Sequence, residues 1–248
     1  MMLAFEPVLS TPLLKIPILL ARAAMVQVAC SPPSTPAKAD ERHRFGRTDI
    51  LTRLRARDGV KLMHALSWTH SICEAAIIAA TYYSSDFSDR IITTLVPGPN
   101  SAAHRLAITP TFLLGASLVF VGGFTRLACH QSLGRFFTWD LAVREDHQLI
   151  TTGPYSVVRH PAYAGSAIIS IGNILCMFSA GSWWTECGVL STPLGKLFAA
   201  QWLLHWIALP IALTMRIPKE DEVLKREFGE QWMAWAKRTP YRLIPYIY

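Results

Sequence analysis

The chain alternates between long apolar stretches and polar connecting segments rich in charge, proline and glycine. A helix needs about 20 apolar residues to cross the hydrocarbon core of a bilayer. Five stretches approach or exceed that length, and their approximate bounds are Leu13–Cys30, Leu62–Tyr83, Leu106–Cys129, Ala162–Ala180 and Leu190–Met215. The pattern predicts an all-α polytopic integral membrane protein with about five transmembrane helices.

The last third of the chain changes character after the fifth stretch. Between Lys219 and Arg238, apolar side chains recur at helical spacing with charged residues between them; they are Val223, Leu224, Phe228, Trp232 and Trp235. This spacing predicts an amphipathic tail helix whose aromatic face lies on the membrane surface. Because the residue before a proline resists the helical conformation, we expect Pro218 to end the fifth span and start the tail helix.

Small residues indicate where the predicted helices approach one another. Gly115, Gly122 and Gly123 in the third span permit close contact with a neighbour. Ala162, Ser166 and Ser170 repeat every fourth residue in the fourth span. With the short connection to the fifth span, they predict a tight C-terminal helical hairpin.

Composition and charge agree with a membrane protein. Hydrophobic residues make up 51% of the chain and charged residues only 17%. The net charge of +7 could suggest nucleic acid, but the Lys and Arg residues gather between spans one and two, between spans three and four, and in the tail. Five alternating spans place these three segments on one side, which the positive-inside rule makes cytoplasmic. We therefore expect no nucleic-acid partner.

A few polar residues lie inside the predicted spans. Arg22 lies in the first span, and His70 and Glu74 lie four residues apart in the second, so these two can pair across a helical turn. Such residues are candidates for function, but a structural, neutralised pair explains them equally well. The five cysteines are widely spaced without a Cys-x-x-Cys pair, so neither a disulfide framework nor a metal site is predicted.

The segment His147–Gly165 concentrates chemistry at the mouth of the fourth span. It contains two histidines, an arginine, two tyrosines and two prolines, and apolar sequence follows at once. An interfacial anchor would account for the individual residues. Their order, with the Arg159-His160-Pro161-x-Tyr163-x-Gly165 cluster downstream of His147-x-Leu149-Ile150, favours a ligand site at the bilayer surface.

Two ordered sets of residues resemble the isoprenylcysteine carboxyl methyltransferase family over roughly the last 120 residues. The first set is the His147–Gly165 segment. The second is Arg216-x-x-x-Glu220-Asp221, Phe228-Gly229-Glu230 and Arg238-Thr239-Pro240. A looser form of this pattern occurs in phospholipid N-methyltransferases and in relatives of the sterol reductases. The chain contains no Gly-x-Gly-x-x-Gly turn, so a Rossmann-type cofactor site is not predicted.

The resemblance implies a methyltransferase that binds S-adenosylmethionine at the cytoplasmic membrane face and a prenylated, farnesyl or geranylgeranyl, C-terminal cysteine from the bilayer. It implies Arg216 as the substrate contact. It implies a cofactor site formed by His147, Gln148, Leu149, Ile150, Tyr155, His160, Pro161, Ala162, Tyr163 and Glu220. An endoplasmic reticulum location also follows from the family alone.

The reaction can be argued from the residues as well. A carboxylate is already ionised at neutral pH and needs no general base, so the enzyme has to hold it in line with the methyl group. An arginine grips a carboxylate through its planar fork, and either Arg159 or Arg216 could do so. Glu220, supported by Asp221, suits the ammonium group of the cofactor.

We therefore expect membrane helices in residues 1–129 and a catalytic region in residues 130–248. The predicted activity is methyl esterification of the C-terminal prenylcysteine of CaaX-processed proteins. The alternatives are a phospholipid N-methyltransferase and a non-catalytic membrane protein of the same fold.

Overall fold

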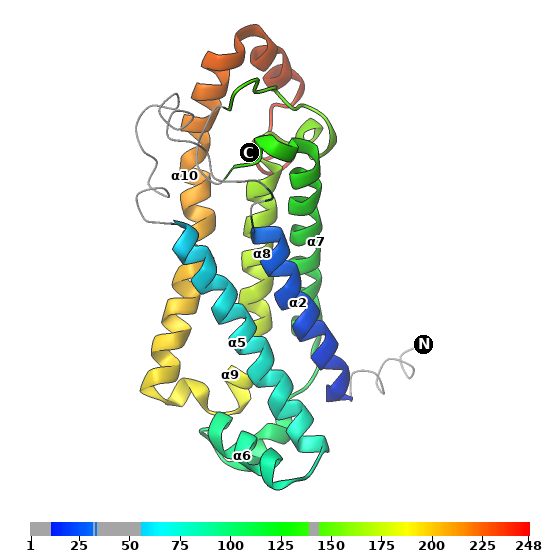
Figure 1. Ribbon diagram of the computed structural model, residues 1–248, viewed down its shortest axis with the longest axis vertical. Helices are drawn as coiled ribbons and strands as arrows, with labels where there is room; N and C mark the ends of the chain where they lie inside the picture. Colours follow the sequence, from blue (N-terminus) through cyan, green and yellow to red (C-terminus); the bar gives the residue numbers. More distant parts are fainter. Residues whose placement is uncertain (1–10, 32, 34–55, 139–143) are drawn as a thin grey trace. The chain divides into compact units, whose positions relative to one another are not determined.

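The structure is a computed structural model that describes residues 11–31, 33, 56–138 and 144–248, with Ala56 and Arg57 described by their backbone alone. Every element in these ranges is a helix (Figure 1). The longer ones are α2 (Lys15–Cys30), α5 (Ala56–Tyr82), α6 (Asp86–Leu95), α7 (Pro110–Leu133), α8 (Pro161–Phe178) and α10 (Pro193–Arg238). The short elements are α9 (Trp183–Glu186) and the 3-10 turns η1 (Pro12–Leu14), η2 (Asn100–Arg105), η3 (Gly134–Phe136), η4 (Gly153–Ser156) and η5 (Val189–Ser191). The all-α prediction is confirmed.

Four of the described helical segments are long and apolar enough to cross a membrane. They begin at Pro12, Pro110, Pro161 and Pro193. The second predicted span forms α5, which is 27 residues long but is not among the four. Its His64, His70 and Glu74 lower the mean hydropathy of that helix. The polytopic prediction is therefore confirmed, with four spans identified by composition where we expected about five.

Two short helices lie where the sequence predicted only loops. Helix α6 begins after Ser85, whose side chain accepts a hydrogen bond from the Ser88 backbone N–H and so caps the helix. Helix α9 is capped in the same way by Ser182 through the Thr185 N–H. Both caps are serines, which favour this position over the helix interior.

The chain packs as two compact units, each built from separated segments. Residues 1–27, 61–120 and 169–207 form the first unit, and residues 28–60, 121–168 and 208–248 form the second. The predicted division into residues 1–129 and 130–248 concerns function rather than compactness, and it stays a prediction. The basic residues Arg42, Arg44, Arg47, Arg53 and Arg55, on which the predicted orientation partly depends, lie outside the described residues.

The first unit has a polar core. Lys15 of α2 lies with its Nζ 2.5 Å from Glu74 Oε1 of α5 and also donates to the Gly181 carbonyl at 2.8 Å. Glu74 Oε2 accepts from the Trp183 backbone N–H at 3.1 Å and lies 3.6 Å from His70 Nε2. All of these side chains are fully buried, so the predicted His70–Glu74 pair exists as part of a larger ion-pair network.

Arg22 is also buried in the first unit and serves structure. Its guanidinium donates to Asn173 of α8 and to Ser71 of α5, 2.9 Å away. These bonds tie three helices together. Close backbone contact adds to this, because a Cβ on Gly115 would lie 2.7 Å from the Gly172 carbonyl oxygen.

In the second unit, the small residues of α8 pack on α7. A Cβ on Gly165 would lie 2.9 Å from the Gly122 carbonyl oxygen. Arg126 of α7 donates to the Ala162 carbonyl at 3.0 Å and to Ser166 Oγ at 2.6 Å. The small-residue face that we assigned to a hairpin with the fifth span therefore contacts the third.

Helix α10 corrects the prediction made from Pro218. It continues without interruption through Pro210 and Pro218, and its non-helical residue is Gly229, with φ 49° and ψ −117°. This conformation is open to glycine and costly for residues with a Cβ. The tail helix is thus an extension of the fifth span, and the chain bends eleven residues later than predicted, at its far end in Figure 1.

Candidate functional site

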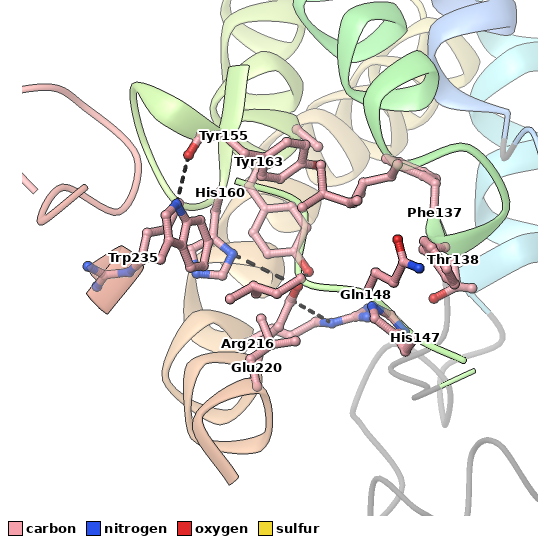
Figure 2. A pocket seen from close by; sticks show the side chains of 17 residues that line it. Phe137, Thr138, His147, Gln148, Tyr155, His160, Tyr163, Arg216, Glu220 and Trp235 are labelled. Carbon is pink, nitrogen blue, oxygen red and sulfur yellow. Dashed lines mark hydrogen bonds and ion pairs between the residues drawn. The ribbon is translucent and has the colours of Figure 1, made fainter. Parts of the chain in front are cut away.

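A pocket in the second unit collects nearly all of the predicted site residues (Figure 2). Its empty space is about 820 Å³, including the part that opens to the surroundings. It is lined by Leu133, Phe136, Phe137, Thr138, His147, Gln148, Leu149, Ile150, Tyr155, Arg159, His160, Ala162, Tyr163, Arg216, Glu220, Leu224 and Trp235.

One wall is formed where the turn at Arg159 and His160 enters α8. Pro161 is the first residue of α8, a position where its missing N–H costs no helical hydrogen bond. His160 and Tyr163 follow closely, and their rings stack with centroids 5.5 Å apart. Pro161 itself is not among the lining residues, so it shapes the turn while its neighbours face the pocket.

The opposite wall comes from α10. Because α10 is continuous at Pro218, Arg216 and Glu220 are one helical turn apart, with Arg216 Nε 3.9 Å from Glu220 Oε2. The Tyr163 hydroxyl donates to the same Glu220 oxygen at 2.5 Å, and His160 Nδ1 lies 3.9 Å from Glu220 Oε1. Figure 2 shows Glu220 directed from this helix toward His160 and Tyr163, with Arg216 beside it. A carboxylate and a guanidinium therefore share one end of the pocket.

The segment from His147 to Ile150 forms a third side and has no regular secondary structure. The His147 ring stacks on Phe136 at 4.7 Å and meets Phe228 at 5.6 Å. Gln148, Leu149 and Ile150 make no hydrogen bond to another described residue.

Burial lowers the pKa of His147, while the carboxylates of Glu227 and Glu220 act in the opposite direction and Arg144 adds to the lowering. The ring is therefore neutral at pH 7. Burial also raises the pKa of Tyr155 well above its usual value, so that phenol keeps its proton. Neither ring carries charge into this part of the pocket.

Arg159 lines the pocket, but its guanidinium is hydrogen-bonded to the C-terminal segment and to Asp221 of α10. Its NH1 donates to the backbone carbonyls of Thr239 and Pro240, at 3.1 and 2.9 Å, and its NH2 donates to Asp221 Oδ2 at 3.2 Å. Of the two arginines that could hold a carboxylate, Arg159 is thus engaged by the C-terminal segment and Asp221, while Arg216 lies beside Glu220 in the pocket lining.

The apolar face of the tail faces the protein. Leu224 and Trp235 line the pocket, Val223 is buried, and Phe228 and Trp232 pack beside them. Trp235 Nε1 donates to the Tyr155 carbonyl at 3.0 Å. This corrects the expectation that the aromatic face lies on the membrane surface: the periodicity was right, but protein covers that face.

Sequence reasoning missed part of the lining. Leu133, Phe136, Phe137 and Thr138 follow the third span and carry no polar signal, and Leu224 and Trp235 were assigned to the interface. In the described part of the chain, no group of three or more His, Cys, Asp or Glu side chains is placed to hold a metal ion.

Part of the chain, including most of the pocket, is similar to known proteins. The profile described as the isoprenylcysteine carboxyl methyltransferase (ICMT) family matches residues 114–226. Protein-S-isoprenylcysteine O-methyltransferase B of Arabidopsis thaliana is 30% identical over 135 residues, which cover 54% of this chain and 58% of the plant protein. A probable protein-S-isoprenylcysteine O-methyltransferase of Oryza sativa subsp. indica is 28% identical over 136 residues, covering 54% of this chain and 61% of that protein.

A second group of relatives carries a different name. Delta(14)-sterol reductase TM7SF2 of Mus musculus is 31% identical over 101 residues, covering 41% of this chain and 20% of the mouse protein. The chain thus spans about three fifths of the methyltransferase relatives and a fifth of the reductase. Residues 114–226, which contain most of the pocket, are therefore similar to the isoprenylcysteine carboxyl methyltransferase family.

Proposed function

We propose that this chain transfers a methyl group from S-adenosylmethionine to the carboxylate of a prenylated C-terminal cysteine. The observation that carries the proposal is the convergence of the His147–Tyr163 segment and the Arg216–Glu220 pair on one pocket. The methyltransferase relatives support it through their shared name.

The pocket residues fit the proposed cofactor. Glu220 keeps 24% of its side chain exposed and offers a carboxylate to the ammonium group. The Tyr163 and His160 rings are adjacent to it and suit a positive sulfonium by cation–π attraction. The backbone groups of residues 148–150, which make no hydrogen bond to another described residue, suit hydrogen bonds to a nucleoside. When bound, the cofactor would supply an electrophilic methyl group on its sulfonium.

Arg216 is the residue that we assign to the substrate carboxylate. It lies within one turn of Glu220, so a carboxylate held by its guanidinium would be next to the methyl donor rather than across the pocket. Its charge is permanent, and its planar fork can donate two parallel hydrogen bonds. Because the carboxylate is ionised at neutral pH, positioning is the main task, and no side chain has to remove a proton.

Esterification has a physical consequence at a membrane. It removes one negative charge beside a prenyl anchor, which strengthens association with an anionic leaflet. We expect the pocket to face the cytoplasm and the protein to be located in the endoplasmic reticulum.

The test is a methylation assay on the purified full chain with labelled S-adenosylmethionine and N-acetyl-farnesylcysteine, N-acetyl-geranylgeranylcysteine or phosphatidylethanolamine. We expect base-labile label in the prenylcysteines and none in the lipid. Arg216→Lys keeps the charge but loses the fork, so the KM for prenylcysteine should rise while cofactor affinity is unchanged. Label in the phospholipid would establish the N-methyltransferase alternative. Cofactor binding without turnover of either substrate would indicate a non-catalytic protein.

The similarity to the mouse reductase favours one further candidate, reduction of a sterol double bond. That reaction needs a hydride donor such as a nicotinamide cofactor. Incubation with NADPH and a Δ14-sterol, followed by mass analysis, distinguishes the two: a product heavier by two hydrogens supports the reductase, and its absence supports the methyltransferase.

A further inference from the structure

Asp221 lies beside Glu220 on α10 but is not a lining residue of the pocket. Its side chain is buried, and its carboxylate gathers three donors from two other segments. Oδ1 lies 3.0 Å from His160 Nε2, while Oδ2 lies 3.2 Å from Arg159 NH2 and 3.4 Å from Arg242 Nε. The carboxylate is therefore placed where α10, the start of α8 and the C-terminal segment meet.

Backbone hydrogen bonds also join two of the segments that meet at Asp221. The Arg159 N–H donates to the Tyr241 carbonyl at 2.9 Å, and the His160 N–H donates to the Arg242 carbonyl at 2.8 Å. The residues that Asp221 holds by their side chains are thus also joined to each other through the backbone. Small movements of Asp221 would be transmitted to His160 and to the end of the chain together.

His160 is the part of this arrangement that touches the pocket. With Nε2 directed at Asp221, its Nδ1 is on the side of Glu220, 3.9 Å from Oε1, and its face stacks on Tyr163. A carboxylate at Nε2 favours the tautomer with hydrogen on Nε2, which leaves Nδ1 as an acceptor on the pocket side. It also fixes the plane of the ring.

We propose that Asp221 is a positioning residue: it sets the tautomer and orientation of His160 and thereby the affinity of the pocket for its cofactor. This inference rests on the proposed function for the identity of that cofactor. It assigns different tasks to two adjacent acids, since Glu220 meets the ligand and Asp221 acts through His160.

The experiment combines two readouts on the full chain in detergent. Asp221→Asn is nearly isosteric, and Glu222→Gln is the matched control because Glu222 is exposed on the same helix. Calorimetric titration with S-adenosylmethionine should give a Kd about tenfold higher for Asp221→Asn, the loss typical of removing a carboxylate that orients a histidine, and no change for Glu222→Gln. His160→Gln should also raise the Kd. The double variant Asp221→Asn/His160→Gln should have a Kd no higher than that of whichever single variant binds S-adenosylmethionine more weakly.

The second readout is independent of the cofactor. In protein labelled with ¹⁵N-histidine, the His160 ring signals, assigned by their absence in His160→Gln, should show hydrogen on Nε2 and should shift in Asp221→Asn. Losses in Kd that multiply in the double variant, or unchanged His160 signals in Asp221→Asn, would overturn the proposal. Should wild-type protein bind no S-adenosylmethionine, the proposed function fails while the ring signals still decide the role of Asp221.

A third variant distinguishes the positioning role of Asp221 from a need for Asp221 in folding. If Asp221→Asn does not fold, Asp221→Glu keeps the charge but moves the carboxylate by one methylene. A rise in Kd with shifted His160 signals supports the positioning role, and wild-type values for both contradict it.

Discussion

Glu220→Gln isolates the charge of the one pocket carboxylate that meets the proposed cofactor. The amide keeps the shape of the side chain and still accepts from the Tyr163 hydroxyl, which is 2.5 Å from Oε2 in the wild type. What is lost is the negative charge opposite the cofactor's ammonium group. The variant therefore tests electrostatic recognition with little change in packing.

The expected size follows from the exposure of Glu220. A hydrogen bond to a charged group is worth about 1.5–3 kcal/mol when buried, and an exposed ion pair about 0–1 kcal/mol. Glu220 lies between these cases, since 24% of its side chain is exposed. We expect a loss of about 1–2 kcal/mol, which corresponds to a Kd roughly 5 to 30 times higher at about 1.4 kcal/mol per tenfold.

The assay is calorimetric titration of wild type and variant with two ligands. S-adenosylhomocysteine carries the ammonium group of the cofactor on a neutral sulfur, and 5′-methylthioadenosine has the nucleoside and the neutral sulfur without that group. Only the first should bind more weakly to Glu220→Gln. Equal losses for both ligands would mean that the substitution disturbs the pocket as a whole, and no loss for either would remove Glu220 from the cofactor site.

Three further predictions concern stability. Lys15→Met should lower the free energy of unfolding by about 3–5 kcal/mol, because it leaves the buried Glu74 carboxylate unpaired, and the double variant Lys15→Met/Glu74→Leu should recover most of it in thermal melts. Gly165→Ala should cost about 1–3 kcal/mol in the same assay, since its Cβ would lie 2.9 Å from the Gly122 carbonyl oxygen, and an unchanged melting temperature would contradict this. Burial lowers the pKa of His147 below its usual 6.5, so the neutral ring contributes its full stabilisation above pH 6.5, and this stabilisation is lost as the pH falls from there toward the folded-state pKa. Between pH 7.5 and 5, the melting temperature should therefore fall less in His147→Asn than in the wild type. Parallel curves for the two proteins would contradict this.

Features that depend on the length and order of apolar runs were predicted well from the sequence. All five predicted spans form helices, because in a bilayer every backbone polar group has to be satisfied within the helix. Spans one, three, four and five are also apolar enough to cross a membrane, and the fifth continues beyond its expected end to Arg238. The candidate cofactor and substrate residues also lie together, since all of them except Pro161 line one pocket, although Arg216 and Glu220 are the members of the second ordered set that do so.

The errors have a common cause. Periodicity states which face of a helix is apolar but not what covers it, so Trp235 and Leu224 were assigned to lipid although they line the pocket. The same limit applies to Ser166, whose partner is Arg126 of the third span rather than a residue of the fifth. Arginine at position 126 was missed because one charge in an apolar run gives no indication of its partners.

The departure at Pro218 has a direct bearing on the site. Local rules place a helix end before this proline, and such an end would leave the separation of Arg216 from Glu220 undefined. The helix continues instead, which fixes the two side chains one turn apart, and the chain bends only at Gly229. That later bend returns Trp235 and the Thr239–Arg242 segment to Tyr155, Arg159 and His160. The continuous helix at Pro218 thus keeps Arg216 and Glu220 side by side in the pocket, and the break at Gly229 allows Trp235 to pack against Tyr155 on its aromatic side. Sequence rules fail most often where function imposes a geometry, and here the failure lies between the two charges on which the proposed reaction depends.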